Sequence, residues 1–143
     1  MTDIKHDISI GGTADQVYKA VSTYSGVAGW WTKQCTISPD VGGVCHFAFD
    51  APDGRMEVDA DVAALDDGRR VSWSITQNSK HPSWVGTSVT FNIAPDGDTT
   101  RLAFDHSGFS GQPEFLPQYD QGWQMFLGSI KSFVETGQGK SPY

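Results

Sequence analysis

Apolar and polar residues alternate one by one along most of the middle of the chain. The alternation runs through five segments: 45–49, 56–62, 71–75, 85–93 and 101–106. Because neighbouring side chains of a strand point to opposite faces, this pattern predicts strands with one buried and one solvent-facing side. Residues 4–10, with apolar side chains on one face, predict a further strand. Turns rich in Pro, Asp and Gly at 52–54, 66–68 and 95–97 indicate antiparallel connections.

The apolar spacing becomes helical near the C-terminus. Trp123, Phe126, Leu127 and Ile130 follow a helical period, which predicts a long helix over 113–136 with Pro113 near its start. Two short helices are expected between the first two strands, one capped by Thr13 and one over 27–32. The predicted fold class is therefore α+β: a curved antiparallel sheet wrapped around a long C-terminal helix, with two short helices between the first two strands.

The length and net charge of the chain limit the number of domains and the kinds of partner that we expect. The 143 residues are expected to form a single domain over 1–143, because a chain of this size buries one core. The formal net charge of −7 argues against nucleic acid as a partner, since phosphate binding needs a cationic surface. No apolar run reaches about 18 residues, and the N-terminus does not resemble a signal peptide, so we expect no membrane span and a cytoplasmic location.

The two cysteines are expected to be reduced thiols, as is usual in the cytoplasm. The turn sequence at 39–43 raises a second hypothesis. A chain that folds back about residue 40 places Cys35 opposite Cys45, where the two thiols would be close enough to pair under oxidation.

Titratable residues form no recognisable catalytic or metal-binding motif. The four histidines have no ligand spacing, so neither a metal nor a cofactor is expected. Cys45 and His46 are sequence neighbours on a strand and would point to opposite faces, so we assign no catalytic residue. His106 shares the buried face of its strand, where it would either orient a ligand or cap the core through a backbone contact. Thr87 is a second inward polar residue with the same two interpretations.

Aromatic residues are abundant, with 8 Phe, 5 Trp and 4 Tyr. Large aromatic side chains either fill a core or line an apolar cavity. Trp30 and Trp31 are consecutive on a short helix and face different directions, so we expect at least one to reach the mouth of any cavity. Trp84 has the opposite parity to Val85, which predicts an outward position. Together with Phe109 it would form an exposed apolar patch or a dimer contact.

Short motifs in a fixed order resemble those of the START/Bet v 1-like (SRPBCC) superfamily, and more closely the branch homologous to the activator of Hsp90 ATPase. These motifs cover nearly the whole chain: VYKAV at 17–21, GWW at 29–31, VGG at 41–43 with Phe47, DDGRRVSW at 66–73, HSGF at 106–109, GWQMFL at 122–127 and FVETG at 133–137. The resemblance implies the helix-grip fold and a cavity between helix and sheet that takes an apolar small molecule or lipid. It also implies that some relatives are enzymes, and the name of the branch suggests contact with a chaperone.

We therefore expect a protein that binds a small hydrophobic molecule, lipid-like or aromatic, between the sheet and the C-terminal helix. Two alternative functions remain open: a cyclase or hydrolase that uses the same cavity, and a stress-related or chaperone-accessory interaction module. A homodimer also remains open, whichever function the chain has. The expected ligand-binding residues are those that face the helix–sheet interior: Trp30, Trp31, Phe47, Phe49, Met56, Trp73, Thr87, Phe104, His106, Tyr119, Trp123, Phe126 and Leu127.

Overall fold

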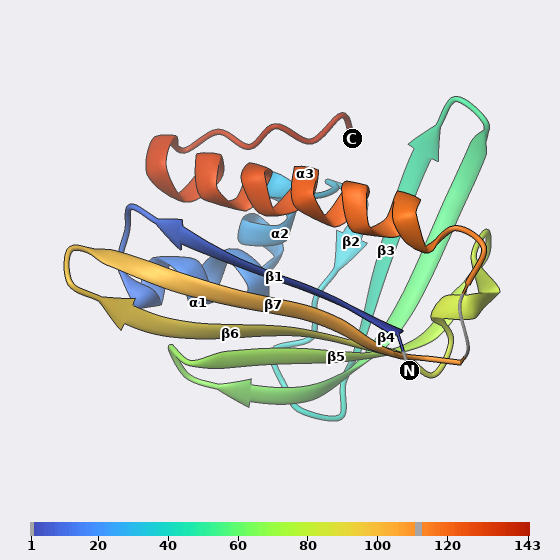
Figure 1. Cartoon of the computed structure of the whole chain (residues 1–143), viewed down its shortest axis with the longest axis horizontal. Coiled ribbons are helices and arrows are strands. Elements are labelled where there is room, and N and C mark those ends of the chain that lie inside the picture. The colour runs from blue at the N-terminus through green and yellow to red at the C-terminus, as the bar shows by residue number, and fades with distance from the viewer. Residues whose placement is uncertain (1, 111–112) are drawn as a thin grey trace.

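A computed structural model describes residues 2–110 and 113–143 of the chain. These residues form one seven-stranded sheet, three α-helices and one short 3-10 turn. Figure 1 shows the long helix α3 lying across the curved sheet, with α1 and α2 at one end of the sheet. The elements in chain order are β1 Thr2–Ile10, α1 Ala14–Ser22, α2 Tyr24–Trp30, β2 Cys35–Thr36, β3 Val44–Ala51, β4 Gly54–Asp66, β5 Arg70–Asn78, the turn η1 Pro82–Trp84, β6 Ser88–Asp96, β7 Thr99–Phe109 and α3 Leu116–Thr136.

The sheet is an antiparallel meander closed by the first strand. Strands β2 to β7 follow one another in space as they do in sequence, and β1 pairs with the free side of β7. Leu102 of β7 lies between Ile8 of β1 and Ile93 of β6, which places three apolar side chains at one level of the inner face. The predicted fold class, a curved sheet around a long C-terminal helix, is confirmed.

Local sequence explains how two of the helices begin and end. Thr13 caps α1 through a reciprocal capping box, in which its hydroxyl accepts from the backbone of Gln16 and the Gln16 side chain accepts from the backbone of Thr13. α3 begins at Leu116 rather than at 113, and Pro117, not Pro113, is its first-turn proline. Its end is the predicted one: Gly137 adopts a left-handed conformation with φ 85°, which a residue without a Cβ reaches at low cost.

The second short helix spans Tyr24–Trp30, three residues earlier than the sequence pattern indicated, because the hydroxyl of Thr23 caps it. Close packing of α1 on α2 requires Gly26. A Cβ at this position would lie 2.3 Å from the carbonyl oxygen of Lys19 and 2.6 Å from Cα of Ala20. Trp30 is the last residue of α2 and Trp31 its C-cap, and both indoles are buried in the core.

One prediction about the outer surface is wrong. Trp84 and Phe109 are 6% and 2% exposed, so they form no exposed patch. The strand that was expected from 85 begins only at Ser88, and Trp84 belongs to the turn η1, where strand parity does not apply. As a result Trp84 points inward and Val85 is half exposed.

The cysteines are also displaced from their expected positions. Cys35 pairs with Phe47 across the short β2–β3 ladder, so it is not opposite Cys45. Both thiols are buried and free in the structure. The chain does fold back between them, but the pairing register differs by two residues from the one that the sequence suggested.

The core lies between the inner face of the sheet and the helices. Its largest fully buried side chains include Trp30, Trp73, Phe47 and Phe91. Among the described residues, no helix is both long and apolar enough to cross a membrane.

Candidate functional site

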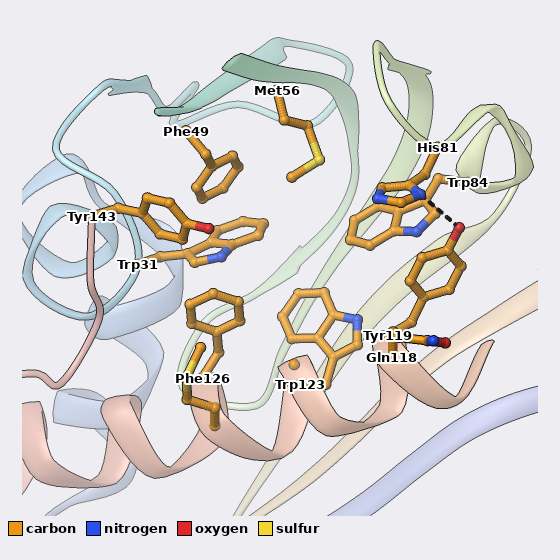
Figure 2. Close-up of a pocket in the computed structure, with 12 residues that line it drawn as sticks. Trp31, Phe49, Met56, His81, Trp84, Gln118, Tyr119, Trp123, Phe126 and Tyr143 are labelled. Carbon is orange, nitrogen blue, oxygen red and sulfur yellow. Dashed lines mark hydrogen bonds between the residues drawn. The ribbon is translucent and has the colours of Figure 1, made fainter. Parts of the chain in front are cut away.

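A cavity of about 270 Å³ opens beside the first half of α3. This volume is slightly below the range of about 300–1,000 Å³ that is typical of small-molecule sites. Five parts of the chain meet around it: α3, the C-cap of α2, the β3–β4 hairpin, the segment around η1 and the C-terminal tail. We call it the α3 cavity, and Figure 2 shows the residues that line it: Trp31, Phe49, Met56, His81, Trp84, Gln118, Tyr119, Gly122, Trp123, Met125, Phe126 and Tyr143.

Three tryptophans form much of the apolar wall. The ring of Trp31 lies 5.5 Å from that of Trp123 and 5.0 Å from that of Phe49, measured between centroids. Trp84 stacks on Trp123 at 6.1 Å with an interplanar angle of 23°. The rings contact one another, so each side chain of the wall is held in place by its aromatic neighbours.

The C-terminal tail supplies the remaining edge of the wall. Figure 1 shows the tail running back along α3 towards the β3–β4 hairpin. Tyr143 packs edge-to-face on Phe49, with ring centroids 5.1 Å apart, and is 36% exposed. Its ring therefore separates the α3 cavity from solvent on that side.

A polar corner lies at the η1 side of the cavity. The hydroxyl of Tyr119 lies 3.0 Å from Nδ1 of His81, the bond drawn in Figure 2, and 3.1 Å from the hydroxyl of Ser83. Burial lowers the pKa of His81, the nearby ammonium of Lys80 lowers it further, and Asp53 opposes both. His81 is therefore neutral at pH 7. Proton transfer to a molecule in the cavity would use His81 and Tyr119, since both groups line it.

His106 lies behind the wall rather than in it. It is fully buried, Trp123 donates from Nε1 to its Nδ1 at 3.1 Å, and its Nε2 lies 2.8 Å from the hydroxyl of Thr87. Thr87 in turn donates to the carbonyl oxygen of Trp84. Burial lowers the pKa of His106 to about 3, so the ring is neutral and fixes the orientation of Trp123 and the position of Trp84. Both polar residues that the sequence pattern placed inward have their polar atoms satisfied inside the protein.

The structure divides the predicted ligand-binding residues into two groups. Six line the α3 cavity: Trp31, Phe49, Met56, Tyr119, Trp123 and Phe126. The others lie in the packed core, outside the cavity lining: Trp30, Phe47, Trp73, Thr87, Phe104, His106 and Leu127. Trp73 illustrates the reason. It does face the helix, but Trp31 stacks over it at 6.0 Å and closes that part of the interior.

Six residues of the lining were not predicted: His81, Trp84, Gln118, Gly122, Met125 and Tyr143. Helical spacing from Tyr119 and Trp123 would have found Gln118 and Gly122, which continue the same stripe of α3. No local pattern indicates His81 or Tyr143. His81 directly precedes the turn η1 and Tyr143 lies in the C-terminal tail, and both segments reach the cavity only through contacts with other parts of the chain.

The described lining of the α3 cavity is mainly aromatic, with a few polar groups. None of the described lining residues is Asp, Glu, Lys or Arg. No group of three or more His, Cys, Asp or Glu that fits a metal ion is present in residues 2–110 and 113–143.

Comparisons with known proteins agree with this architecture. The model of the activator of Hsp90 ATPase homolog 1-like protein family matches residues 12–135. The solution structure of the Aha1 dimer from Colwellia psychrerythraea is 28% identical and superposes with a TM-score of 0.81, covering 97% of this chain and all of the other. No curated protein matches the sequence.

Two more distant structures share the fold. Protein MLL2253 from Mesorhizobium loti is 20% identical, with a TM-score of 0.76 and coverage of 93% of this chain and 96% of its own. CalU16 from Micromonospora echinospora is 20% identical, with a TM-score of 0.73 and coverage of 96% of this chain and 76% of its own.

Proposed function

This chain belongs to the activator of Hsp90 ATPase homolog 1-like family, and from that premise we propose that it binds a small, neutral, apolar molecule in the α3 cavity. The family's helix-grip fold places a long helix against a one-sided apolar sheet. In this chain the two do not pack completely together along the first half of α3, and the cavity lies there.

The observation that carries the proposal is the aromatic wall of the cavity. Trp31, Trp84 and Trp123 lie at its surface, each less than a tenth exposed to solvent. A bound apolar ligand gains about 25 cal/mol for each Å² of apolar surface removed from water. The preformed, mutually packed rings also reduce the ordering cost of binding, because little of the wall has to move.

Titration with fluorene, a planar hydrocarbon, tests the proposal. We expect saturable quenching of tryptophan fluorescence, since three of the five tryptophans line the cavity. Native mass spectrometry is expected to show one ligand per chain.

Two glycines of α3 provide a matched pair of variants. Gly122 lines the cavity and Gly128 does not, and a Cβ at either position has open space around it. Gly122→Leu is expected to fill the cavity and weaken fluorene binding by at least about tenfold, equivalent to about 1.4 kcal/mol. Gly128→Leu adds the same side chain to the same helix and is expected to leave binding unchanged. Equal affinity in both variants would show that fluorene binds elsewhere, and no saturable binding to the wild type would refute the proposal.

We also propose that the chain forms a homodimer. The Aha1 from Colwellia psychrerythraea, which is 28% identical over nearly the full length, was solved as a dimer. Sedimentation equilibrium is expected to give twice the 15.5 kDa mass of the chain. A single 15.5 kDa species at high protein concentration would contradict it.

A further inference from the structure

One imidazole of the α3 cavity has a ring nitrogen without a partner. Nδ1 of His81 lies 3.0 Å from the hydroxyl of Tyr119, whereas no described residue forms a hydrogen bond with its Nε2. Figure 2 shows Nδ1 on the side of the ring towards Tyr119 and Nε2 on the other side, towards Met56. All three residues line the cavity, so a molecule bound there can contact Nε2.

The partners of His81 hold its ring in one orientation. The hydroxyl of Tyr119 also lies 3.1 Å from the hydroxyl of Ser83, and the Tyr119 side chain is buried. When Nδ1 carries the proton, it donates to the Tyr119 oxygen, and Tyr119 donates in turn to Ser83. Nε2 then keeps a free lone pair. A base that is oriented by a second hydrogen-bonded group is the arrangement found at sites of proton transfer.

The groups around His81 keep the ring neutral at pH 7, as a base requires. Burial and the ammonium of Lys80 lower its pKa, and Asp53 raises it. Lys80 and Asp53 form an ion pair at 2.6 Å, so their effects on the ring oppose each other. Phe115 packs edge-to-face on the imidazole at 5.6 Å and adds no charge.

The rest of the lining limits the chemistry that this base can assist. None of the described lining residues is Ser, Thr, Cys or Lys, so the cavity offers none of these side chains as a nucleophile. None is Asp, Glu or Arg either, so no charged side chain attracts an ionic substrate. His81 is the one imidazole of the described lining, and the remaining titratable groups are the phenols of Tyr119 and Tyr143.

We propose that the chain catalyses proton transfer in a neutral carbon acid bound in the α3 cavity, with His81 as the catalytic base and Tyr119 as its positioning residue. This inference rests on the proposed function and adds a reaction to it. The lone pair of Nε2 takes a proton from an activated C–H group, and the electron pair of that bond stays on the substrate. In an isomerisation, His81 returns the proton to another atom of the substrate. In an elimination, the electron pair expels a leaving group and His81 releases the proton to water.

The probe 5-nitrobenzisoxazole tests the base directly, because its reaction needs only the removal of one proton. When a base takes the proton from C3, the N–O bond of the ring breaks and the coloured 2-cyano-4-nitrophenolate forms. We expect saturable elimination by the wild type, with competitive inhibition by fluorene. His81→Ala is expected to lower kcat/KM by about 100-fold, the lower end of what a positioned base contributes.

His46→Ala is the matched control for the loss of a histidine. His46 lies outside the described lining and is bonded to Asp59 at 2.5 Å, so this variant is expected to keep the wild-type rate. Equal rates of the His46→Ala and His81→Ala variants would overturn the inference.

The pH dependence separates a catalytic role of the pair from a structural one. The kcat/KM of the wild type is expected to rise with pH through one midpoint below 6.5, as His81 loses its proton. Tyr119→Phe removes the oxygen that accepts from Nδ1, which stabilises the imidazolium more than the neutral ring. The midpoint of this variant is therefore expected to move to lower pH, and kcat to fall by about threefold to tenfold, the usual effect of one hydrogen bond.

The outcomes distinguish this inference from the proposed function. If fluorene binds in the cavity but the elimination does not depend on His81, the inference is wrong and the binding proposal stands. Elimination that fluorene does not inhibit, or a wild-type midpoint above 6.5, would also overturn it, and both are measured without relying on the folding of a variant. A midpoint that Tyr119→Phe leaves unchanged would refute the positioning role. If fluorene does not bind at all, the proposed function fails and the inference fails with it.

Discussion

Trp123 donates a hydrogen bond from Nε1 to Nδ1 of His106, and this bond sets the protonation state of the histidine. An Nδ1 that accepts a hydrogen bond carries no proton, so the proton is on Nε2, which faces the hydroxyl of Thr87. Protonation of Nδ1 would bring two N–H donors together in a fully buried site. The Trp123 N–H donor therefore fixes which nitrogen of His106 carries the proton, and burial of the ring lowers its pKa.

The first prediction concerns pH. A histidine in the unfolded chain has a pKa of about 6.5, whereas that of His106 in the folded protein is about 3. Between these values the unfolded chain takes up a proton that the folded protein does not, so stability that is present above pH 6.5 is lost as the pH falls towards 3. At pH 5 this loss is about 2 kcal/mol. In an NMR titration the His106 ring signals are expected to stay constant from pH 8 to 5, and a midpoint near 6.5 would contradict the prediction.

The second prediction concerns the C-terminal tail. Ser129 donates to the carbonyl oxygen of Trp30 at 2.7 Å and accepts from the backbone N–H of Lys140 at 2.7 Å, and it is fully buried. Ser129→Ala leaves both backbone groups unpaired and is expected to lower the free energy of unfolding by about 1–3 kcal/mol.

Hydrogen exchange measures the effect of Ser129→Ala on the tail, where faster exchange is expected at Lys140 and beyond. Ser132→Ala is the control. Ser132 also donates to the tail, at the carbonyl oxygen of Gln138, but this bond is exposed, so a change within about 0.5 kcal/mol is expected. Equal effects of the two variants would show that burial of the Ser129 bonds is unimportant.

The third prediction concerns glycines in helices. Gly26→Ala would place a methyl group 2.3 Å from the carbonyl oxygen of Lys19, so α1 and α2 must separate. Overpacking of this kind is expected to reduce the free energy of unfolding by about 1–3 kcal/mol in chemical denaturation. Gly128→Ala, in open space on α3, is expected to raise it by about 0.5–1 kcal/mol. Stabilisation by Gly26→Ala would refute the close approach.

The fourth prediction concerns thiol reactivity. Burial raises the pKa of Cys35 to about 11, with a further contribution from Cys45, and burial raises the pKa of Cys45 as well. At pH 8 only about one Cys35 in a thousand is then a thiolate, the form that reacts. Native protein is expected to react with a disulfide reagent far more slowly than protein in guanidinium, where both thiols are accessible.

Mild oxidation is expected to leave two free thiols. Cys35 lies opposite Phe47, so Cys45 is its diagonal neighbour on the ladder. Diagonal neighbours on a ladder are about 7–8 Å apart, with their Cβ atoms somewhat closer, whereas the two Cβ atoms of a disulfide are about 3.8 Å apart. A Cys35–Cys45 disulfide under these conditions would show that the ladder shifts by two residues in solution.

The alternation of apolar and polar residues predicted the strands well, because which face of a strand is buried can be read from that strand's own sequence. It placed Phe49, Trp73 and Phe104 inside the protein, and all three are buried. It was wrong at Val85 and Trp84, where a 3-10 turn interrupts the pattern. The β2–β3 register was also wrong, because the chain folds back about residue 41 rather than residue 40, which makes Phe47 instead of Cys45 the partner of Cys35.

The cavity was harder to predict than the core. An inward-facing aromatic ring of the sheet either packs against other rings or borders a cavity. Which of the two occurs depends on the side chains of the helix or loop that lies opposite the ring. Trp73 and Trp31 face the same interior, yet Trp31 covers Trp73 and itself lines the cavity. The position of Tyr143 depends on the C-terminal tail, which Ser129 holds in place. Ser129 bonds to Lys140, 11 residues away in the sequence, and to Trp30, 99 residues away, so no local pattern indicates this arrangement.

The pairing of the first strand with the last strand also determines when the protein can complete its sheet during synthesis. β1 has no partner until β7 has left the ribosome, about 100 residues later. At about 5–20 residues per second, β1 waits for roughly 5–20 s. During this time its apolar face, with Ile4 and Ile10, has no sheet to cover it. The pairing that adds β1 to the edge of the sheet therefore makes the first ten residues of the nascent chain dependent on its last third, because β7 and α3 both lie there.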